Sequence, residues 1–192
     1  MIYLDNAATS WPKPPEVKEA MMRFLDSAGG NPGRSGHQMS VDAGRVVYQA
    51  RESVAKLLGA SDPLRVIFTM NATHAINIAL TGILKPGDRV VTTGMEHNSV
   101  MRPLRELERK GTEVAVVPCD PNGRLNMSAL EERAAGARMV VVNHASNVVG
   151  TIQDIETATR LAHAAGAVMV VDAAQTAGAA LLTDYILTVS VS

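Results

Sequence analysis

Short apolar runs rich in β-branched residues alternate with helical stretches along most of this chain, and this alternation limits the possible folds most strongly. The runs are flanked by turn residues such as Pro86-Gly87-Asp88, as is typical of strands buried on both faces. We predict strands at residues 66–69, 90–93, 114–117, 139–143 and 168–172. Apolar residues at helical spacing predict helices at 16–28, 40–58, 73–84, 99–110, 128–135 and 155–165. This order favours an α/β fold, with a mostly parallel sheet covered by helices on both faces.

Composition excludes several classes of protein. The chain has 192 residues, of which 46% are hydrophobic, so a packed core is expected and a disordered tail is not. The formal net charge of −1 gives no electrostatic reason to expect nucleic acid or an anionic membrane as a partner. The only cysteine, Cys119, excludes a disulfide scaffold and favours a reducing compartment, so we expect a cytoplasmic protein. No stretch reads as a signal peptide or a membrane span.

The familiar short motifs of other enzyme classes are absent. The sequence has no GxGxxG after a strand, no GxxxxGK[ST] and no GxSxG, which removes the usual signals for nicotinamide cofactors, P-loops and hydrolase nucleophiles. None of the five histidines has the spacing of a metal site, so we predict no bound metal. Cys119 has no local base, and we expect it to be a loop thiol.

Polar residues instead follow the predicted strands directly. In a parallel sheet with helical crossovers, ligands bind outside the carboxyl ends of the strands. Ala72-Thr73-His74 stands where a strand is expected to give way to a helix, and free N–H groups at such a point favour a phosphate. Asp172 ends an apolar run, where a carboxylate is costly unless a cation pairs with it. The sequence therefore predicts a ligand site at the strand ends.

Six stretches, in order, give this site a family resemblance. They are YLDNAATSWPKP, GGNPGRSGH, FTMNATHAINIAL, GMEHNSVMRPL, NHASNVVGT and VDAAQTAG. Together they resemble the cysteine desulfurase family of class V aminotransferases, which are pyridoxal 5′-phosphate (PLP) enzymes of fold type I. The resemblance covers residues 2 to about 180. It implies the large domain of that fold, the cofactor PLP, L-cysteine as substrate, alanine and an enzyme-bound persulfide as products, a homodimer and a sulfur-acceptor protein.

The resemblance also assigns roles to residues. Ala72 and Thr73 match the phosphate site, and His97 matches a catalytic histidine that stacks on the pyridine ring. A carboxylate at Asp172 would hold the pyridine nitrogen protonated, which makes PLP a better electron sink. Gln175 resembles the donor to the ring oxygen, and Asn147 matches an asparagine near that oxygen and the substrate carboxylate.

Plainer structural roles remain open for each of these residues. Either Asn71 or Thr73 could simply be the N-cap of the helix that follows. Asp172 could likewise be the N-cap of a helix. His97 also precedes a predicted helix, which it would cap from the surface, and Asn147 suits a turn.

The chain departs from the family in its last part. Family members carry a Schiff-base lysine in a Ser/Thr-Gly-His-Lys motif one strand beyond DAAQ, and this sequence has no such motif. Its lysines are Lys13, Lys18, Lys56, Lys85 and Lys110. We therefore expect a truncated protein: residues 1–35 as an N-terminal segment and active-site loop, residues 36–192 as an incomplete PLP-binding large domain, and no C-terminal small domain. Either residues 184–188 begin the strand that leads to the lysine, or about the last dozen residues are unrelated sequence.

Three functions are consistent with this sequence. The first is a cysteine desulfurase-like enzyme that is inactive as this chain alone. The second is another class V lyase or aminotransferase, such as a selenocysteine lyase. The third is a non-catalytic fragment that binds PLP or acts as a dimerisation module.

Overall fold

The computed structural model describes residues 2–6, 8–34, 36–178 and 187–188. The chain divides into two compact units, Met1–Phe68 and Thr69–Ser192, which are described separately. The boundary expected between residues 35 and 36 stays a prediction. None of the described helices is long and apolar enough to cross a membrane.

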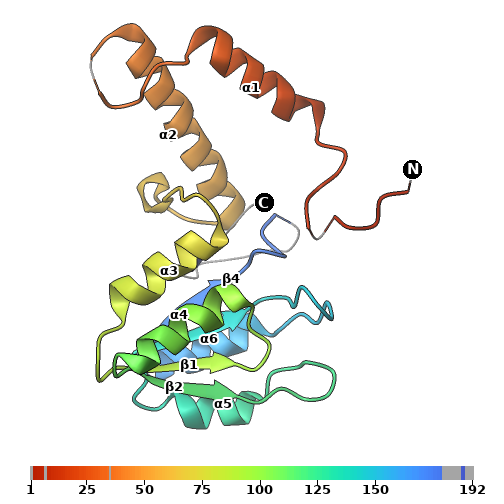
Figure 1. Ribbon diagram of the computed structural model, residues 1–192, viewed down its shortest axis with the longest axis vertical. Coiled ribbons are helices and arrows are strands. Elements are labelled where there is room, and N and C mark those ends of the chain that lie inside the picture. The colour runs from red at the N-terminus through yellow and green to blue at the C-terminus, as the bar shows by residue number, and fades with distance from the viewer. Residues whose placement is uncertain (1, 7, 35, 179–186, 189–192) are drawn as a thin grey trace. The chain divides into compact units, whose positions relative to one another are not determined.

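The second unit is built on a parallel sheet (Figure 1). Its strands are β1 (Arg89–Thr93), β2 (Glu113–Val117), β3 (Met139–Asn143), β4 (Val168–Asp172) and β5 (Leu187–Thr188). Their order is β2-β1-β3-β4-β5, and every neighbouring pair is parallel. The predicted strands at 90–93, 114–117, 139–143 and 168–172 are confirmed. In the predicted stretch 184–188, residues 187–188 are the end strand β5, and 184–186 lie outside the described residues.

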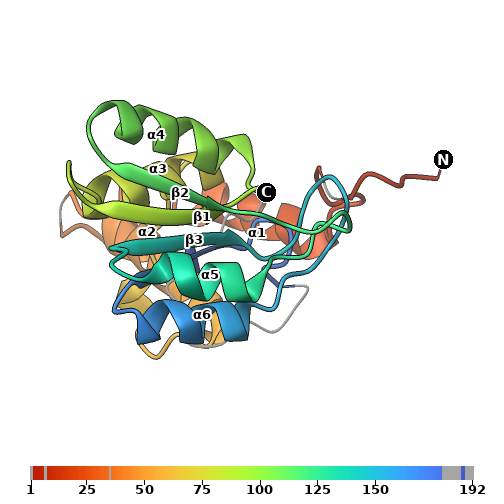
Figure 2. The same ribbon diagram turned by 90° about the horizontal axis from the view of Figure 1, so that it is seen from below.

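Helices cover both faces of this sheet, as predicted. Figure 2 shows α4 (Asn98–Arg109) on one side of the strands, and α5 (Met127–Ala134) and α6 (Ile155–Ala164) on the other. α3 (Ala72–Ile83) packs beside α4. Successive strand residues point to opposite faces. Val90, Met139, Val141 and Val170 accordingly share one buried cluster with leucines and other apolar residues of α3 and α4.

The first unit consists of α1 (Pro15–Ser27), α2 (Gln38–Leu58) and a short 3₁₀-helix, η1 (Pro63–Arg65). Pro15 stands at the first position of α1, where its missing N–H has no intrahelical partner to lose. The imidazole Nδ1 of His37 caps α2 by accepting a hydrogen bond from the N–H of Ser40, 3.2 Å away. Gly59 ends α2 in the left-handed conformation, with φ of 70°.

The prediction of a strand at residues 66–69 is wrong, because the structure has no strand there. The N–H of Val66 donates to the carbonyl oxygen of Pro63 at 3.1 Å, which continues the turn of η1, and the following residues have no regular structure. Ile67 is 74% exposed, and none of the five strands in the described part of the chain pairs with this stretch. β-branched composition favours a pleated surface, but a strand also needs a partner for its backbone groups.

Candidate functional site

The strands of the second unit end level with one another. Thr93 pairs with Val117, and Asn143 pairs with Asp172, so β1, β2, β3 and β4 share one boundary, called here the carboxyl edge. Figure 1 shows that α3 and α4 both begin on the side of the sheet where these strands end. The residues that follow the strands and open the helices therefore meet at this edge.

The start of α3 leaves backbone N–H groups available. The side-chain oxygen Oδ1 of Asn71 accepts a hydrogen bond from the N–H of His74 at 2.9 Å, so Asn71 is the N-cap. The first N–H groups of a helix have no acceptor within it. The cap occupies only that of His74, which leaves the N–H groups of Ala72 and Thr73 for a ligand. Ala72 is half-buried and Thr73 is exposed.

His97 caps α4, as one of its two possible roles requires. Its Nδ1 accepts a hydrogen bond from the N–H of Ser99 at 3.1 Å, and it also lies 2.9 Å from the hydroxyl of Ser99. An Nδ1 that accepts a hydrogen bond has a free lone pair, so the neutral ring carries its proton on Nε2. The residue is exposed. Capping thus fixes the tautomer of His97 and leaves Nε2 for another partner.

Asp172 ends β4 as a buried acid that is only 7% exposed. Its Oδ1 accepts a hydrogen bond from the N–H of Ala174 at 3.1 Å. Burial raises the pKa of Asp172, whereas the Ala174 N–H and the electrostatic interaction with His97 act in the opposite direction. The structure therefore brings His97 and Asp172 within electrostatic reach, and the carboxylate is sufficiently desolvated to favour a cationic partner.

Asn147 and Gln175 are both exposed. Asn147 lies in a loop closed by an antiparallel bridge between Ala145 and Ile152. The hydroxyl of Ser146 accepts hydrogen bonds from the N–H groups of Val148 and Val149, at 3.2 and 3.3 Å, which holds the loop tightly turned. Roles for Asn147 and Gln175 at a cofactor stay predictions.

Glu96, which was not among the predicted site residues, is a prominent residue at the carboxyl edge. Its Oε1 accepts hydrogen bonds from the Thr93 hydroxyl at 2.7 Å and from the N–H of Asn143 at 2.9 Å. Burial of the carboxyl group raises the pKa of Glu96 to about 8, and the negative charge of Asp172 acts in the same direction. One feature of the sequence could have indicated Glu96: it is an acid in the turn that follows a buried strand, three residues beyond Thr93.

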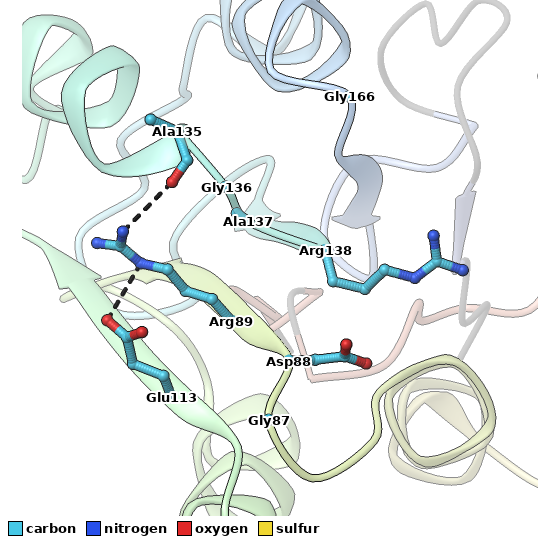
Figure 3. Close-up of a pocket in the computed structure, with 9 residues that line it drawn as sticks. All are labelled: Gly87, Asp88, Arg89, Glu113, Ala135, Gly136, Ala137, Arg138 and Gly166. Carbon is cyan, nitrogen blue, oxygen red and sulfur yellow. Dashed lines mark hydrogen bonds and ion pairs between the residues drawn. The ribbon is translucent and has the colours of Figure 1, made fainter.

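Other groups on the second unit do not extend the site. A hollow of about 430 Å³ is lined by Gly87, Asp88, Arg89, Glu113, Arg138 and four further alanines and glycines (Figure 3). It lies at the starts of the strands, opposite the carboxyl edge, and Arg89 there is paired with Glu113 at 3.2 Å. Burial raises the pKa of the Cys119 thiol, which does not favour a nucleophile. Among the described residues, no cluster of His, Cys, Asp and Glu could hold a metal ion.

Comparisons with known proteins agree with this arrangement. The aminotransferase class-V family matches residues 2–182. The cysteine desulfurase IscS of Edwardsiella ictaluri is 39% identical over 184 residues, covering 92% of this chain and 45% of its own length. A probable cysteine desulfurase of Methanothermobacter thermautotrophicus is 37% identical, with 92% and 44% covered. The chain thus spans less than half the length of these relatives.

Solved structures give the same answer for the fold. The apo structure of a cysteine desulfurase from Thermococcus onnurineus matches with a TM-score of 0.85 and 36% identity, covering 92% of this chain and 44% of that one. A protein named SspA, solved in complex with cysteine, matches with a TM-score of 0.82 and 27% identity, covering 92% of this chain and 51% of its own. The sequence match, the sheet and its helices lead to one conclusion: the chain belongs to the aminotransferase class-V family and has the fold of its cysteine desulfurases.

Proposed function

We propose that residues 69–192 carry the PLP-binding edge of an enzyme of the cysteine desulfurase type. The observation that carries this proposal is Asp172: a carboxylate only 7% exposed, at the end of a parallel strand and within electrostatic reach of His97. A buried acid is costly without a partner, and a protonated pyridine nitrogen supplies one.

The residues at the carboxyl edge fit PLP by their chemistry. The cofactor has a phosphate, a flat ring and a basic ring nitrogen. The start of α3 suits the phosphate, because the Asn71 cap leaves the N–H groups of Ala72 and Thr73, and the Thr73 hydroxyl lies beside them. The imidazole of His97 suits one face of the ring, and the raised pKa of Asp172 marks a carboxylate without full compensation.

Bound PLP would supply an electron sink for negative charge that develops on the substrate α-carbon. Asp172 would keep a proton on the ring nitrogen and thereby strengthen that sink. His97 holds its own proton on Nε2, where it could be donated at the reacting end of the site, because Nδ1 is engaged by Ser99. Gln175 and Asn147 carry amide groups able to donate to the ring oxygen.

The proposed substrate is L-cysteine, converted to alanine with transfer of sulfur to the enzyme. Support comes from the names of the relatives and from the cysteine present in the SspA structure. By the same likeness we propose a homodimer, a sulfur-acceptor protein and a cytoplasmic location. A selenocysteine lyase or another class V enzyme is the nearest alternative, and assays of the full enzyme with L-cysteine and L-selenocysteine would separate them.

Replacing Thr73 by alanine should weaken PLP binding. The hydroxyl is exposed at the start of α3, and a hydrogen bond to a charged group contributes about 1.5–3 kcal/mol. Absorbance titration of the 192-residue chain with PLP measures the change. Thr157→Ala is the control, since Thr157 belongs to the first turn of α6. Equal affinity of Thr73→Ala and the unmodified chain would contradict the phosphate assignment.

We also expect this chain alone to lack desulfurase activity with PLP supplied, because none of its lysines follows a strand at the carboxyl edge. Lys85 and Lys110 are exposed and precede β1 and β2, at the opposite end of the strands, and Lys13, Lys18 and Lys56 come before every strand in the described part of the chain. Borohydride reduction with PLP followed by mass spectrometry should find no single preferred pyridoxyl-lysine. Sulfide release from cysteine should equal that of PLP in buffer. One specifically labelled lysine, with sulfide release above that blank, would show this prediction to be wrong.

A further inference from the structure

Glu96 links the ends of two strands through its carboxyl group. It follows β1, and its Oε1 accepts from the Thr93 hydroxyl on the same strand and from the N–H of Asn143 at the end of β3. A second link uses the side chain of Asn143, whose Nδ2 donates to the carbonyl oxygen of Met95 at 3.1 Å. Two hydrogen bonds therefore join the turn after β1 to Asn143.

Two oxygen atoms in this junction are unsatisfied. Oε2 of Glu96 and Oδ1 of Asn143 are both buried, and neither has a hydrogen-bond partner in the described part of the chain. Two acceptors of this kind cannot satisfy each other, and each unpaired buried acceptor is unfavourable. A proton on Oε2 of Glu96 would turn that atom into a donor, and Oδ1 of Asn143, which belongs to the residue already hydrogen-bonded to Glu96, would offer it an acceptor.

The charges around Glu96 also favour a proton there. Burial raises the pKa of Glu96 to about 8, so the acid form predominates at neutral pH. The charged group facing it from β4 is Asp172, and the thiol of Cys119 faces it from beyond β2. His97 is its neighbour in the chain. An ionised Glu96 would add a negative charge beside Asp172, and no N–H of the described residues donates to Oε2.

We propose that Glu96 is a positioning residue of the PLP site: as a neutral acid it donates from Oε2 to Oδ1 of Asn143 and clamps the end of β1 to the end of β3. The clamp fixes His97, the next residue, relative to Asp172, the register partner of Asn143 on β4. It also keeps Asp172 as the single negative charge of the pair. The link to PLP rests on the proposed function, whereas the proton and the clamp do not.

The proton is tested without any cofactor. In the 192-residue chain labelled with ¹³C in its glutamate side chains, one carboxyl signal should titrate near pH 8, and the backbone N–H of Asn143 and the ring of His97 should change over the same range. Glu96→Gln should abolish all three changes, and Glu131→Gln, an exposed site on α5, should abolish none. If every glutamate titrates near its ordinary pKa, or the His97 ring shows no change near pH 8, the proposal fails.

Positioning is tested by PLP titration at about pH 7 and about pH 9. Gln keeps a donor and an acceptor, so Glu96→Gln should bind PLP at pH 7 like the unmodified chain, whereas Glu96→Ala should bind about tenfold more weakly. From pH 7 to pH 9 the unmodified chain and Glu131→Gln should lose up to about tenfold more affinity for PLP than Glu96→Gln does. The reason is that both still contain Glu96, which ionises over this range, whereas glutamine cannot ionise. Equal weakening by Gln and Ala, or identical pH profiles, would overturn positioning. If no variant binds PLP, the proposed function fails, and the changes in the NMR signals of the His97 ring and the Asn143 N–H near pH 8 still decide the clamp.

Discussion

Asp172→Asn should weaken PLP binding by about 3–5 kcal/mol, or about 10²- to 10⁴-fold in affinity, because removing one partner of a buried charge pair leaves the other uncompensated. Asparagine has nearly the same shape and keeps an oxygen for the N–H of Ala174, so the local turn should persist. Absorbance titration with PLP at neutral pH measures the loss. Affinity within a factor of about three of the unmodified chain would remove Asp172 from the site.

The same substitution should stabilise the free chain. Burial raises the pKa of Asp172 in the folded state above its ordinary value. The folded state therefore holds this proton more tightly than the unfolded state, and ionisation at neutral pH reduces the free energy of unfolding. Asparagine cannot ionise and removes that cost. Thermal unfolding without PLP should show a higher midpoint for Asp172→Asn at neutral pH, and the difference should vanish below the ordinary pKa of aspartate.

Asp154→Asn is the matched control for both measurements. Asp154 is an exposed N-cap of α6, and its Oδ1 accepts from the N–H of Thr157 at 3.0 Å. That hydrogen bond lowers the pKa of Asp154, so its charged form contributes stability that is lost as the pH falls. Asp154→Asn should thus leave PLP affinity unchanged and give no gain in thermal stability. A gain of the same size in both variants would rule out the burial of Asp172 as the cause.

Gln153→Ala should destabilise the second unit by about 2–5 kcal/mol, because it leaves two buried backbone groups without partners. Gln153 is 5% exposed, and its side chain joins two loops at the carboxyl edge. Oε1 accepts from the N–H of Leu125 at 2.9 Å, and Nε2 donates to the carbonyl oxygen of Gly123 at 2.7 Å. Chemical denaturation followed by circular dichroism measures the change in the free energy of unfolding.

Gln153→Glu separates the two hydrogen bonds. A carboxylate at this position still accepts from the N–H of Leu125 but cannot donate to the carbonyl oxygen of Gly123. Gln153→Glu should therefore destabilise the second unit through the loss of the hydrogen bond to Gly123 and through the burial of a charge. Its destabilisation should diminish at acid pH, where the acid form donates again, whereas that of Gln153→Ala should not. Equal stability of Gln153→Ala and the unmodified chain would show that water replaces the side chain and that the loops do not depend on it.

Much of the second unit could be predicted from local sequence. The strand runs are apolar and β-branched because both faces of the sheet are covered, and every strand from β1 to β4 was found within one residue of its bounds. The helices were also found within two residues, because their ends depend on nearby capping groups such as Asn71 and His97. The position of Asp172 at a strand end followed from the same local pattern.

The failures concern contacts between distant residues. Residues 66–69 have the composition of a strand, but pairing needs a second strand, which composition does not supply. Glu96 looks like an ordinary turn acid in sequence. Its burial depends on Asn143, which is 47 residues away and donates to it across the sheet. No periodicity within either segment contains that information.

The alternation of strands and helices, the helix caps and the family could all be predicted from the chain's amino acids, because they depend on neighbouring residues or on motifs read in order. Tertiary structure alone decided the strand order β2-β1-β3-β4-β5 and the register that sets Asn143 beside Asp172. It also decided which acids at the carboxyl edge lose their water, Glu96 and Asp172. The physical reason is that desolvation depends on everything packed around a carboxyl group, and most of those neighbours come from other strands.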